Sequence, residues 1–247
     1  MAAEFRLLVI TDSHYAVDHE PGTTKLCCER GCELIGLAIE DARRHGFDTI
    51  ALLGDLVNEA AGPGYEGTGP NFERELADIR ERITAAAPDA PLVVVPGNHD
   101  RYPDALLAAF GARAGLREIG GYRFFVFADA YAKGDYCTRS RTDLETLRDV
   151  AARGGGPIVA LQHGPISPEI DSSEYPYMHT NRDAILSAYT DAGVLLSISG
   201  HYHARQELNE NAGVLYFTAP AIAEPPFPYT IVALSGRNVT IEPYELG

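Results

Sequence analysis

The sequence predicts a layered, mixed α/β fold in a single domain. Short runs of strand-favouring residues alternate with stretches in which Leu, Ile and Ala recur every three or four residues, the spacing of an amphipathic helix. The early runs are almost continuously apolar, as strands covered on both faces are. No internal repeat or low-complexity linker interrupts residues 1–247, so we expect one domain.

The predicted elements follow one another in alternating order. The predicted strands are 5–10, 49–53, 92–95, 123–127, 158–161, 194–198, 214–217, 230–234 and 239–242. The predicted helices between them are 24–45, 71–87, 103–114, 142–153 and 181–192. The last three strands follow one another without helices, which predicts antiparallel pairing. Asn71 and Thr142 stand where helix N-cap residues belong.

The composition limits the partners of the protein. A chain of 247 residues can bury a sizeable core, and 45% hydrophobic with 22% charged residues is typical of a soluble globular protein. The 35 Asp and Glu residues outnumber the 20 Lys and Arg residues, so the formal net charge is −15. Because an acidic surface repels polyanions, we expect no nucleic acid polymer as a partner, and an anionic substrate must be captured by local positive charge.

Neither the N-terminus nor the cysteines indicate secretion. MAAEFRLLVI enters an apolar strand with no basic segment, no signal-length apolar stretch and no cleavage site, so we expect a cytoplasmic location and no membrane contact. Cys27, Cys28 and Cys32 crowd into one predicted helix, and Cys137 stands apart, which does not indicate a disulfide framework. Buried thiols are favoured over a metal site built from Cys28 and Cys32.

Polar side chains follow five of the predicted strands, at the end of an α/β sheet where functional sites are built. Five of the 8 histidines stand in these turns, and scattered core histidines would not cluster in this way. The residues in the turns are Asp12, His14, Asp55, Asn98, His99, Asp100, His163, His201 and His203.

These residue types are those of a binuclear metal site. First-row dications bind imidazole nitrogen together with carboxylate or amide oxygen. Two cations about 3.5–4 Å apart can hold both the attacking and the leaving oxygen of an in-line displacement at phosphorus. With Asp12, Asp55 and a bridging hydroxide, two dications keep a net charge of about +1 to hold a phosphoryl group. Asp12, Asp55 or Asn98 alone would more readily be read as a turn cap, but the five turns together favour metal ligation.

The motifs resemble those of the calcineurin-like binuclear metallophosphoesterases. DSH at 12–14, GDLVN at 54–58, GNHD at 97–100, a lone His163 after a strand, and GHYH at 200–203 occur in the order of that family. The resemblance implies a four-layer α/β/β/α sandwich of two mixed sheets flanked by helices, with two metals at the strand ends.

The resemblance also implies a role for each residue. The residues implied for one metal are Asp12, His14, Asp55 and His203, and those for the other are Asp55, Asn98, His163 and His201. Asp55 would bridge the two metals, for which Mn is favoured and Fe or Zn is also suitable. His99 would bind phosphate and protonate the leaving oxygen, with Asp100 as its orienting partner; an imidazolium beside a carboxylate is chemically suited to that task.

The expected function is hydrolysis of a small phosphodiester by in-line attack of a metal-bridging hydroxide, with His99 as general acid. GNHD, GHYH and the modest length resemble the class III cyclic nucleotide phosphodiesterase branch. Protein serine/threonine phosphatases usually carry Arg-Gly after the second motif, whereas Glu59 follows GDLVN here. A repair nuclease would be expected to show basic tracks, and none is visible. A phosphomonoesterase, a nucleotide pyrophosphatase and a non-catalytic metal-binding scaffold are the alternatives.

Specificity is expected to come from the long loops at the strand ends, which are 15–23, 59–71, 165–180 and 221–229. The aromatic residues considered for a substrate pocket are Tyr15, Tyr175, Tyr177, Phe227 and Tyr229. Packing of these rings beneath the Pro-rich turns explains them at least as well.

Four further polar residues stand outside the predicted ligand set. Asn58 is either a support for the metal ligands or an ordinary loop residue. His45 is expected in the last turn of a helix before Gly46. His19 and His179 are expected to be solvated in loops, with contact to substrate as the alternative.

Overall fold

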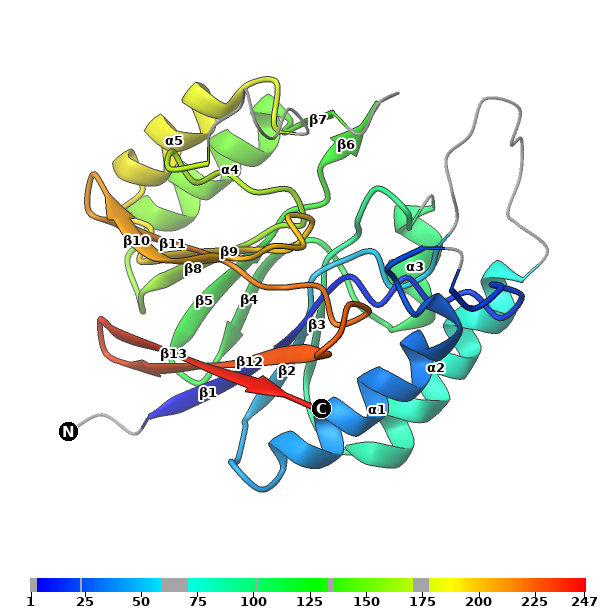
Figure 1. Ribbon diagram of the computed structural model, residues 1–247. Coiled ribbons are helices and arrows are strands. Elements are labelled where there is room, and N and C mark those ends of the chain that lie inside the picture. Colours follow the sequence, from blue (N-terminus) through cyan, green and yellow to red (C-terminus); the bar gives the residue numbers. More distant parts are fainter. Residues whose placement is uncertain (1–3, 23, 59–70, 101, 133–135, 171–177) are drawn as a thin grey trace.

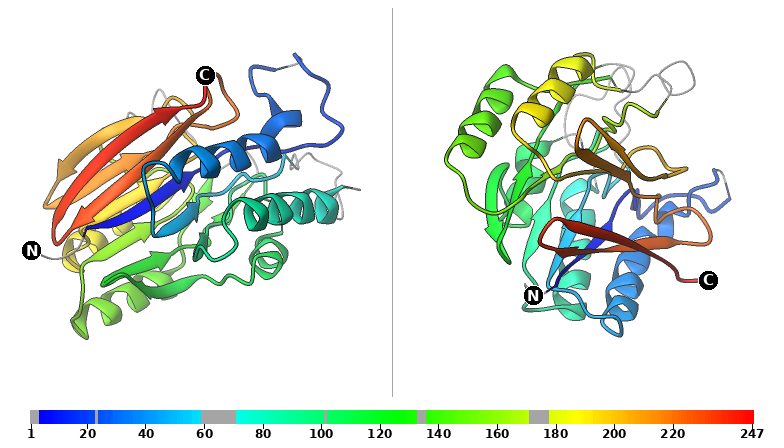
Figure 2. Two further views of the ribbon diagram at one scale, coloured as in Figure 1. Left: turned by 90° about the horizontal axis from the view of Figure 1, so that it is seen from below. Right: turned by 90° about the vertical axis from the view of Figure 1, so that its left-hand side faces the viewer.

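The computed structural model describes residues 4–22, 24–58, 71–100, 102–132, 136–170 and 178–247. Two sheets pack face to face, with α1, α2 and α3 on one outer side and α4 and α5 on the other (Figure 1). Figure 2 shows the same layers from two further directions. The predicted α/β class, with two mixed sheets flanked by helices, is confirmed.

The first sheet has five strands in the order β13-β12-β1-β2-β3. Their bounds are β1 Phe5–Ile10, β2 Thr49–Leu52, β3 Leu92–Val94, β12 Pro228–Ser235 and β13 Asn238–Glu245. β1, β2 and β3 run parallel, whereas β12 pairs antiparallel with both β1 and β13. The parallel strands therefore place their carboxyl ends, and the turns that follow them, at one edge.

The second sheet has six strands in the order β10-β11-β9-β8-β5-β4. Their bounds are β4 Gly115–Ile119, β5 Tyr122–Val126, β8 Ile158–Leu161, β9 Leu196–Ser199, β10 Gln206–Asn211 and β11 Val214–Thr218. The four inner strands run parallel, and the edge strands β4 and β10 are antiparallel to their neighbours. A two-stranded ribbon, β6 Ala130–Tyr131 and β7 Cys137–Thr138, lies apart from both sheets.

The helices cover the outer faces of the sheets. Their bounds are η1 Cys28–Arg30, α1 Gly31–Ala42, α2 Phe72–Ala86, α3 Pro103–Ala109, α4 Arg141–Ala152 and α5 Arg182–Asp191. Ser140 caps α4 by accepting a hydrogen bond from the Asp143 amide at 3.0 Å, so the predicted N-cap Thr142 is wrong. Asn71 does stand at the N-cap position of α2, but its side chain donates to Asp18 Oδ2 instead.

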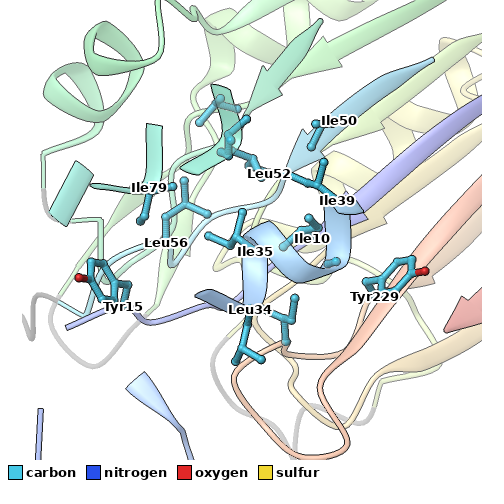
Figure 3. Packing of buried hydrophobic residues seen from close by; sticks show 14 of the residues in the cluster. Ile10, Tyr15, Leu34, Ile35, Ile39, Ile50, Leu52, Leu56, Ile79 and Tyr229 are labelled. Atoms are coloured by element: carbon cyan, nitrogen blue, oxygen red, sulfur yellow. The ribbon is translucent and has the colours of Figure 1, made fainter. Parts of the chain in front are cut away.

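The core has three apolar layers because the central strands are covered on both faces. Leu7 and Val9 of β1 point into the layer between the sheets, while Leu8 and Ile10 point toward α1. Figure 3 shows this outer layer, in which Ile10 meets Leu34 and Ile35 of α1. Side chains alternate between the two faces of a strand, and both faces of β1 are covered here, which is why LLVI at 7–10 carries no polar residue after Arg6. The cysteines are free thiols, as expected.

Three predictions about the elements are wrong. β11 does not join an antiparallel set with β12 and β13, since it lies in the other sheet and pairs parallel with β9. The predicted helix 24–45 is a short 3-10 turn followed by α1, and the predicted helix 103–114 ends at Ala109. The edge strands β4 and β10 were not predicted, because GLREI and QELNEN are half exposed and carry no continuous apolar run.

Candidate metal centre

The polar turns of both sheets meet at one edge of the sandwich. Ligand atoms of Asp12, His14 and His203 lie within 4.8 Å of one another, as do those of Asp55, His163 and His201. A third set joins His14 and Asp55 to His99. Asn98 Oδ1 lies 3.1 Å from His163 Nε2, so the predicted amide is in the same cluster. The structure thus brings together residues that follow β1, β2, β3, β8 and β9.

The Asp12 carboxylate has one anchored oxygen and one oxygen aimed into the cluster. Oδ2 accepts hydrogen bonds from Thr11 Oγ1 at 2.6 Å and from the His201 amide at 2.9 Å. Oδ1 is buried and, within the described part of the chain, accepts no hydrogen bond. It faces the Nε2 atoms of His203, His14 and His163 at 3.3, 3.8 and 4.0 Å. A buried carboxylate oxygen without a donor is costly unless a cation binds it.

Asp55 lies between the two halves of the cluster. Its Oδ1 accepts the backbone amide of His99 at 2.8 Å. Its Oδ2 lies 3.2 Å from His163 Nε2 and 3.7 Å from His14 Nε2. The side chain therefore faces an imidazole from each half of the cluster, which is the placement that a bridging carboxylate needs.

The orientation of three imidazoles is set by acceptors on their outer nitrogens. His14 Nδ1 faces Asn58 Oδ1 at 3.3 Å, His163 Nδ1 faces the Leu53 carbonyl at 2.6 Å, and His203 Nδ1 faces Glu224 Oε1 at 2.7 Å. Because each partner is an acceptor, each Nδ1 carries a proton, and each Nε2 is the nitrogen that a metal ion would bind after displacing any proton there.

Two of these Nε2 atoms meet directly. His14 Nε2 and His203 Nε2 are 3.3 Å apart. Two acceptor nitrogens at this distance repel each other unless a cation or a proton lies beside them. Asp12 Oδ1, which accepts no hydrogen bond from the described residues, lies beside them. Both observations show that these residues fit a metal ion.

The carboxylates and imidazoles of the cluster shift one another's pKa. Burial alone would raise the pKa of Asp12 and Asp55, but the facing imidazoles, His163 first, hold both below the usual range. Burial would likewise lower the pKa of His163, yet the two carboxylates raise it to about 10. At His201, burial and the neighbouring His163 lower the pKa to about 3 and keep the ring neutral, as a ligand must be.

Asp100 connects two of the turns. Its Oδ1 accepts the amides of Leu56 and Val57 at 2.9 and 3.3 Å, and its Oδ2 accepts the amide of Gly97 at 2.9 Å. Burial and the nearby Asp55 carboxylate raise its pKa to about 6. Asp100 thus fixes the GDLVN turn against the GNHD turn. Its predicted role as orienting partner of His99 stays a prediction.

Several further residues can now be compared with their predicted positions. His179 is buried, not solvated, and its Nε2 contacts Asp129 Oδ2 at 2.8 Å. His45 follows the end of α1 and stacks on Tyr244 with ring centroids 4.1 Å apart. Asn58 is a support for a predicted ligand rather than an ordinary loop residue, since it contacts His14. Glu224, which holds His203, was missed, because a carboxylate in a Pro-rich loop has no sequence signal of that contact.

The loop aromatics pack in the core where they are described. Tyr15, Phe227 and Tyr229 belong to the buried cluster under α1, and Tyr229 lies within β12. These three rings therefore do not form the wall of a substrate pocket. Tyr175 and Tyr177, like most of the loop 59–71, lie outside the described residues.

A comparison with protein families agrees with this geometry. Residues 5–205 match the model of the calcineurin-like phosphoesterase family. The chain belongs to this family. It is also 26% identical over 170 residues to the serine/threonine-protein phosphatase CPPED1 of Danio rerio, which covers 62% of this chain. The chain spans about half of that relative, 53% of its length.

Solved structures share the calcineurin-like fold over almost the whole chain. A dimetal phosphatase from Danio rerio superposes with a TM-score of 0.74 at 16% identity and covers 98% of this chain and 99% of its own. A purple acid phosphatase from yellow lupin seeds has a TM-score of 0.62 at 13% identity, covering 99% of this chain and 52% of its own. At these identities the likeness shows the fold. In the described part of this family member, no helix has the length and apolar character needed to cross a bilayer.

Proposed function

We propose that the protein is a metal-dependent hydrolase of a small phosphodiester related to a cyclic nucleotide. The observation that carries this proposal is the convergence of the Nε2 atoms of His14, His163 and His203 on the carboxylates of Asp12 and Asp55. Membership of the calcineurin-like phosphoesterase family supports it. The ligand type favours Mn, and Fe or Zn also suits imidazole with carboxylate.

The two proposed metal sites share Asp55. One would be held by Asp12, His14, Asp55 and His203, and the other by Asp55, Asn98, His163 and His201. When bound, two cations activate water and neutralise phosphoryl charge. The protein's own contribution is to hold each Nε2 lone pair and each carboxylate oxygen in place before substrate arrives, which lowers the cost of reaching the reactive geometry.

His99 is proposed as the general acid. Its ring is partly exposed at the border of the cluster and meets His14 edge-on, with centroids 4.7 Å apart. Its backbone amide donates to Asp55 Oδ1, which fixes the residue beside the proposed bridge. From there the imidazole can deliver a proton to a leaving alkoxide.

A second candidate is hydrolysis of a phosphomonoester. The observation that favours it is that the relative CPPED1 and both structural neighbours are named as phosphatases. The net charge of −15 supports a small substrate over a nucleic acid polymer in either case, and a cytoplasmic location without membrane contact belongs to the same proposal.

The deciding experiment compares metal-stripped protein with protein reloaded with Mn, Fe or Zn. The substrates are bis-p-nitrophenyl phosphate, p-nitrophenyl phosphate, cyclic nucleotides and a phosphoserine peptide. Turnover that depends on metal and is faster on the diesters supports the first proposal, and faster turnover on the monoesters supports the second. With two metals shown bound, absence of turnover on every substrate would indicate a non-catalytic scaffold.

His99→Ala tests the proposed acid. We expect it to retain both metals by elemental analysis but to lose about 10²–10⁴-fold in rate on substrates with poor leaving groups, because only these need protonation. Substrates with a nitrophenolate leaving group should be affected far less. His45→Ala, which changes an imidazole remote from the cluster, is the matched control. Loss of a metal from His99→Ala would show that His99 is a ligand.

A further inference from the structure

A second charged site lies at the opposite end of the strands from the metal centre. A cavity of about 850 Å³ is bordered by Leu92 at the start of β3, by Arg123 near the start of β5, by β4, and by the end of α4 at Val150. The metal centre follows the carboxyl ends of the parallel strands, whereas this cavity lies at their amino ends. The two sites are therefore separate.

Arginines without acidic partners surround the cavity. Arg113, Arg117, Arg123 and Arg153 all line it, and none of them forms an ion pair within the described part of the chain. Glu118 also lines the cavity and stands opposite Arg123 in the β4–β5 pair, although the two form no ion pair among the described residues. Elsewhere, arginines are typically paired with carboxylates, as in Arg139 with Asp129. Four arginines and one glutamate give the cavity an excess of positive charge in a chain with a net charge of −15.

Arg123 is a fixed positive charge in the cavity wall. It is 8% exposed. Its Nε donates to the Gly156 carbonyl at 2.6 Å, and its Nη1 donates to the carbonyls of Val150 and Gly154 at 2.7 and 2.8 Å. These carbonyls hold the guanidinium at the carboxyl end of α4, where a cation is favourable, and its Nη2 has no hydrogen-bond partner in the described chain.

Apolar side chains also line the cavity and suit an organic group. Leu92, Phe110, Leu116 and Ile119 contribute to the cavity beside the arginines. Its volume lies within the range of about 300–1,000 Å³ usual for small-molecule sites. Guanidinium groups bind phosphate oxygens in a bidentate manner, and several of them favour a ligand with several charges.

We propose that this cavity binds a small organic phosphate carrying more than one negative charge, of the class of nucleoside diphosphates. The phosphates contact the exposed Arg113 and Arg153 and the half-buried Arg117, Arg123 supplies a fixed charge beside them, and the organic part contacts the apolar residues of the lining. Because the rest of the surface is acidic on average, the cavity is where such an anion gains most from local positive charge. The inference is independent of the proposed phosphoesterase activity.

The test is calorimetric titration of metal-stripped protein with ADP in the presence of a chelator. The cavity variant is the triple substitution R113A/R117A/R153A, which leaves Arg123 and its structural hydrogen bonds intact. The matched control is R74A/R141A/R237A, which removes the same charge at exposed positions outside the cavity. We expect wild type and control to bind ADP with equal affinity and the cavity variant to bind at least tenfold more weakly.

Further measurements test whether ADP binding depends on its phosphates and whether each variant is folded. Adenosine, which lacks phosphate, should not displace ADP, and the single variant Arg153→Glu should also weaken ADP binding. Thermal unfolding of each variant checks that it is folded. Equal ADP affinity in the cavity and control variants, or no ADP binding by wild type, would overturn the proposal. Phosphoesterase turnover of the reloaded cavity variant should equal that of wild type, so failure of either proposal is separable from failure of the other.

Discussion

At the residue scale, the metal centre depends on backbone conformations that most residues avoid. Asp12, His14, Asp55 and His201 have φ angles of 55°, 45°, 50° and 65°, in the left-handed region. Each such residue costs about 1–3 kcal/mol in the free energy of folding and persists only where surrounding contacts hold it. Here the amides of Asp12 and His14 are held by the carbonyls of Gly54 and Asp55 at 3.0 and 2.9 Å. This backbone conformation lets Asp12 and His14, which stand in one turn, both place their side chains in the same cluster.

The motif glycines allow these turns to pack against one another, which leads to a prediction. Gly54 has φ +91°, and a Cβ there would lie 2.6 Å from His163 Nδ1, whereas Gly46 has φ +78° with open space around it. We expect Gly46→Ala to cost about 1 kcal/mol in the free energy of unfolding, from the backbone alone. Gly54→Ala should cost more and also displace His163, so that metal affinity falls. Urea unfolding and metal titration of both variants are the measurements; equal behaviour of the two would contradict this account.

Glu224 provides a second prediction at the residue scale. Burial opposes its ionisation, but hydrogen bonds from Lys25 and His203 keep its pKa below the usual value. The resulting carboxylate fixes the His203 tautomer. Glu224→Ala should therefore weaken metal binding about 10–100-fold, as loss of such partners typically does. Competition with a chromophoric chelator measures the affinity. Glu207→Ala on β10, an exposed carboxylate paired with Arg205, is the control and should leave it unchanged.

At the scale of elements, a buried network connects the ribbon β6–β7, helix α5 and strand β8. Arg139 donates from Nε and Nη2 to the two oxygens of Asp129 at 2.8 and 2.7 Å, and His179 contacts the same carboxylate. Arg139 also reaches Tyr189 Oη, which donates to Gln162 at 2.8 Å. Gln162 directly precedes His163, so the network supports the strand end that carries a proposed ligand.

Asp129→Asn should destabilise the protein by about 3–5 kcal/mol, because it leaves the fully buried Arg139 charge without its counter-ion. Urea unfolding at pH 7 measures the loss. Glu33→Gln, which breaks the exposed pair with Arg30, should change the free energy of unfolding by no more than about 1 kcal/mol. A similar loss of unfolding free energy in both variants would contradict the claim that the buried ion pair contributes more than the exposed one.

The Asp129–Arg139 pair also predicts how the stability of the protein depends on pH. Burial alone would raise the pKa of Asp129, but Arg139 and His179 lower it below the usual range. A lowered folded-state pKa stabilises the protein above the unfolded value of about 3.9 and loses that contribution as the pH falls toward the folded value. The stability difference between wild type and Asp129→Asn should therefore shrink when unfolding is measured at pH 3 instead of pH 7.

At the scale of the whole molecule, the proposed metals connect the two sheets. Asp12, Asp55 and Asn98 follow strands of the first sheet, and His163 and His203 follow strands of the second. Bound cations would cross-link the sheets at the edge where buried carboxylates and imidazoles concentrate charge. Ions that bind only the folded protein stabilise it by mass action.

Removal of metal should therefore lower the melting temperature. At a free-ion concentration 100 times Kd, binding contributes about 2.7 kcal/mol, which corresponds to about 5–10 °C for a chain of this size. Thermal unfolding before and after chelation, and after addition of Mn, measures the shift. Asp12→Asn, which lacks one of the converging carboxylates, should respond much less to the chelator. No shift in wild type that has demonstrably lost its metals would contradict a cross-linking role.

The sequence by itself determined the α/β class, most of the strands and the membership of the nine turn residues in one site. This was possible because apolar runs and the polar turns that follow them are local patterns, and parallel strands bring such turns to one edge. The pairing of β11, the polar edge strands, Glu224 beside His203, and the burial of His179 against Asp129 were decided only by the tertiary structure. Each of these depends on a contact between segments far apart in the chain, and no local pattern of residues specifies such a contact.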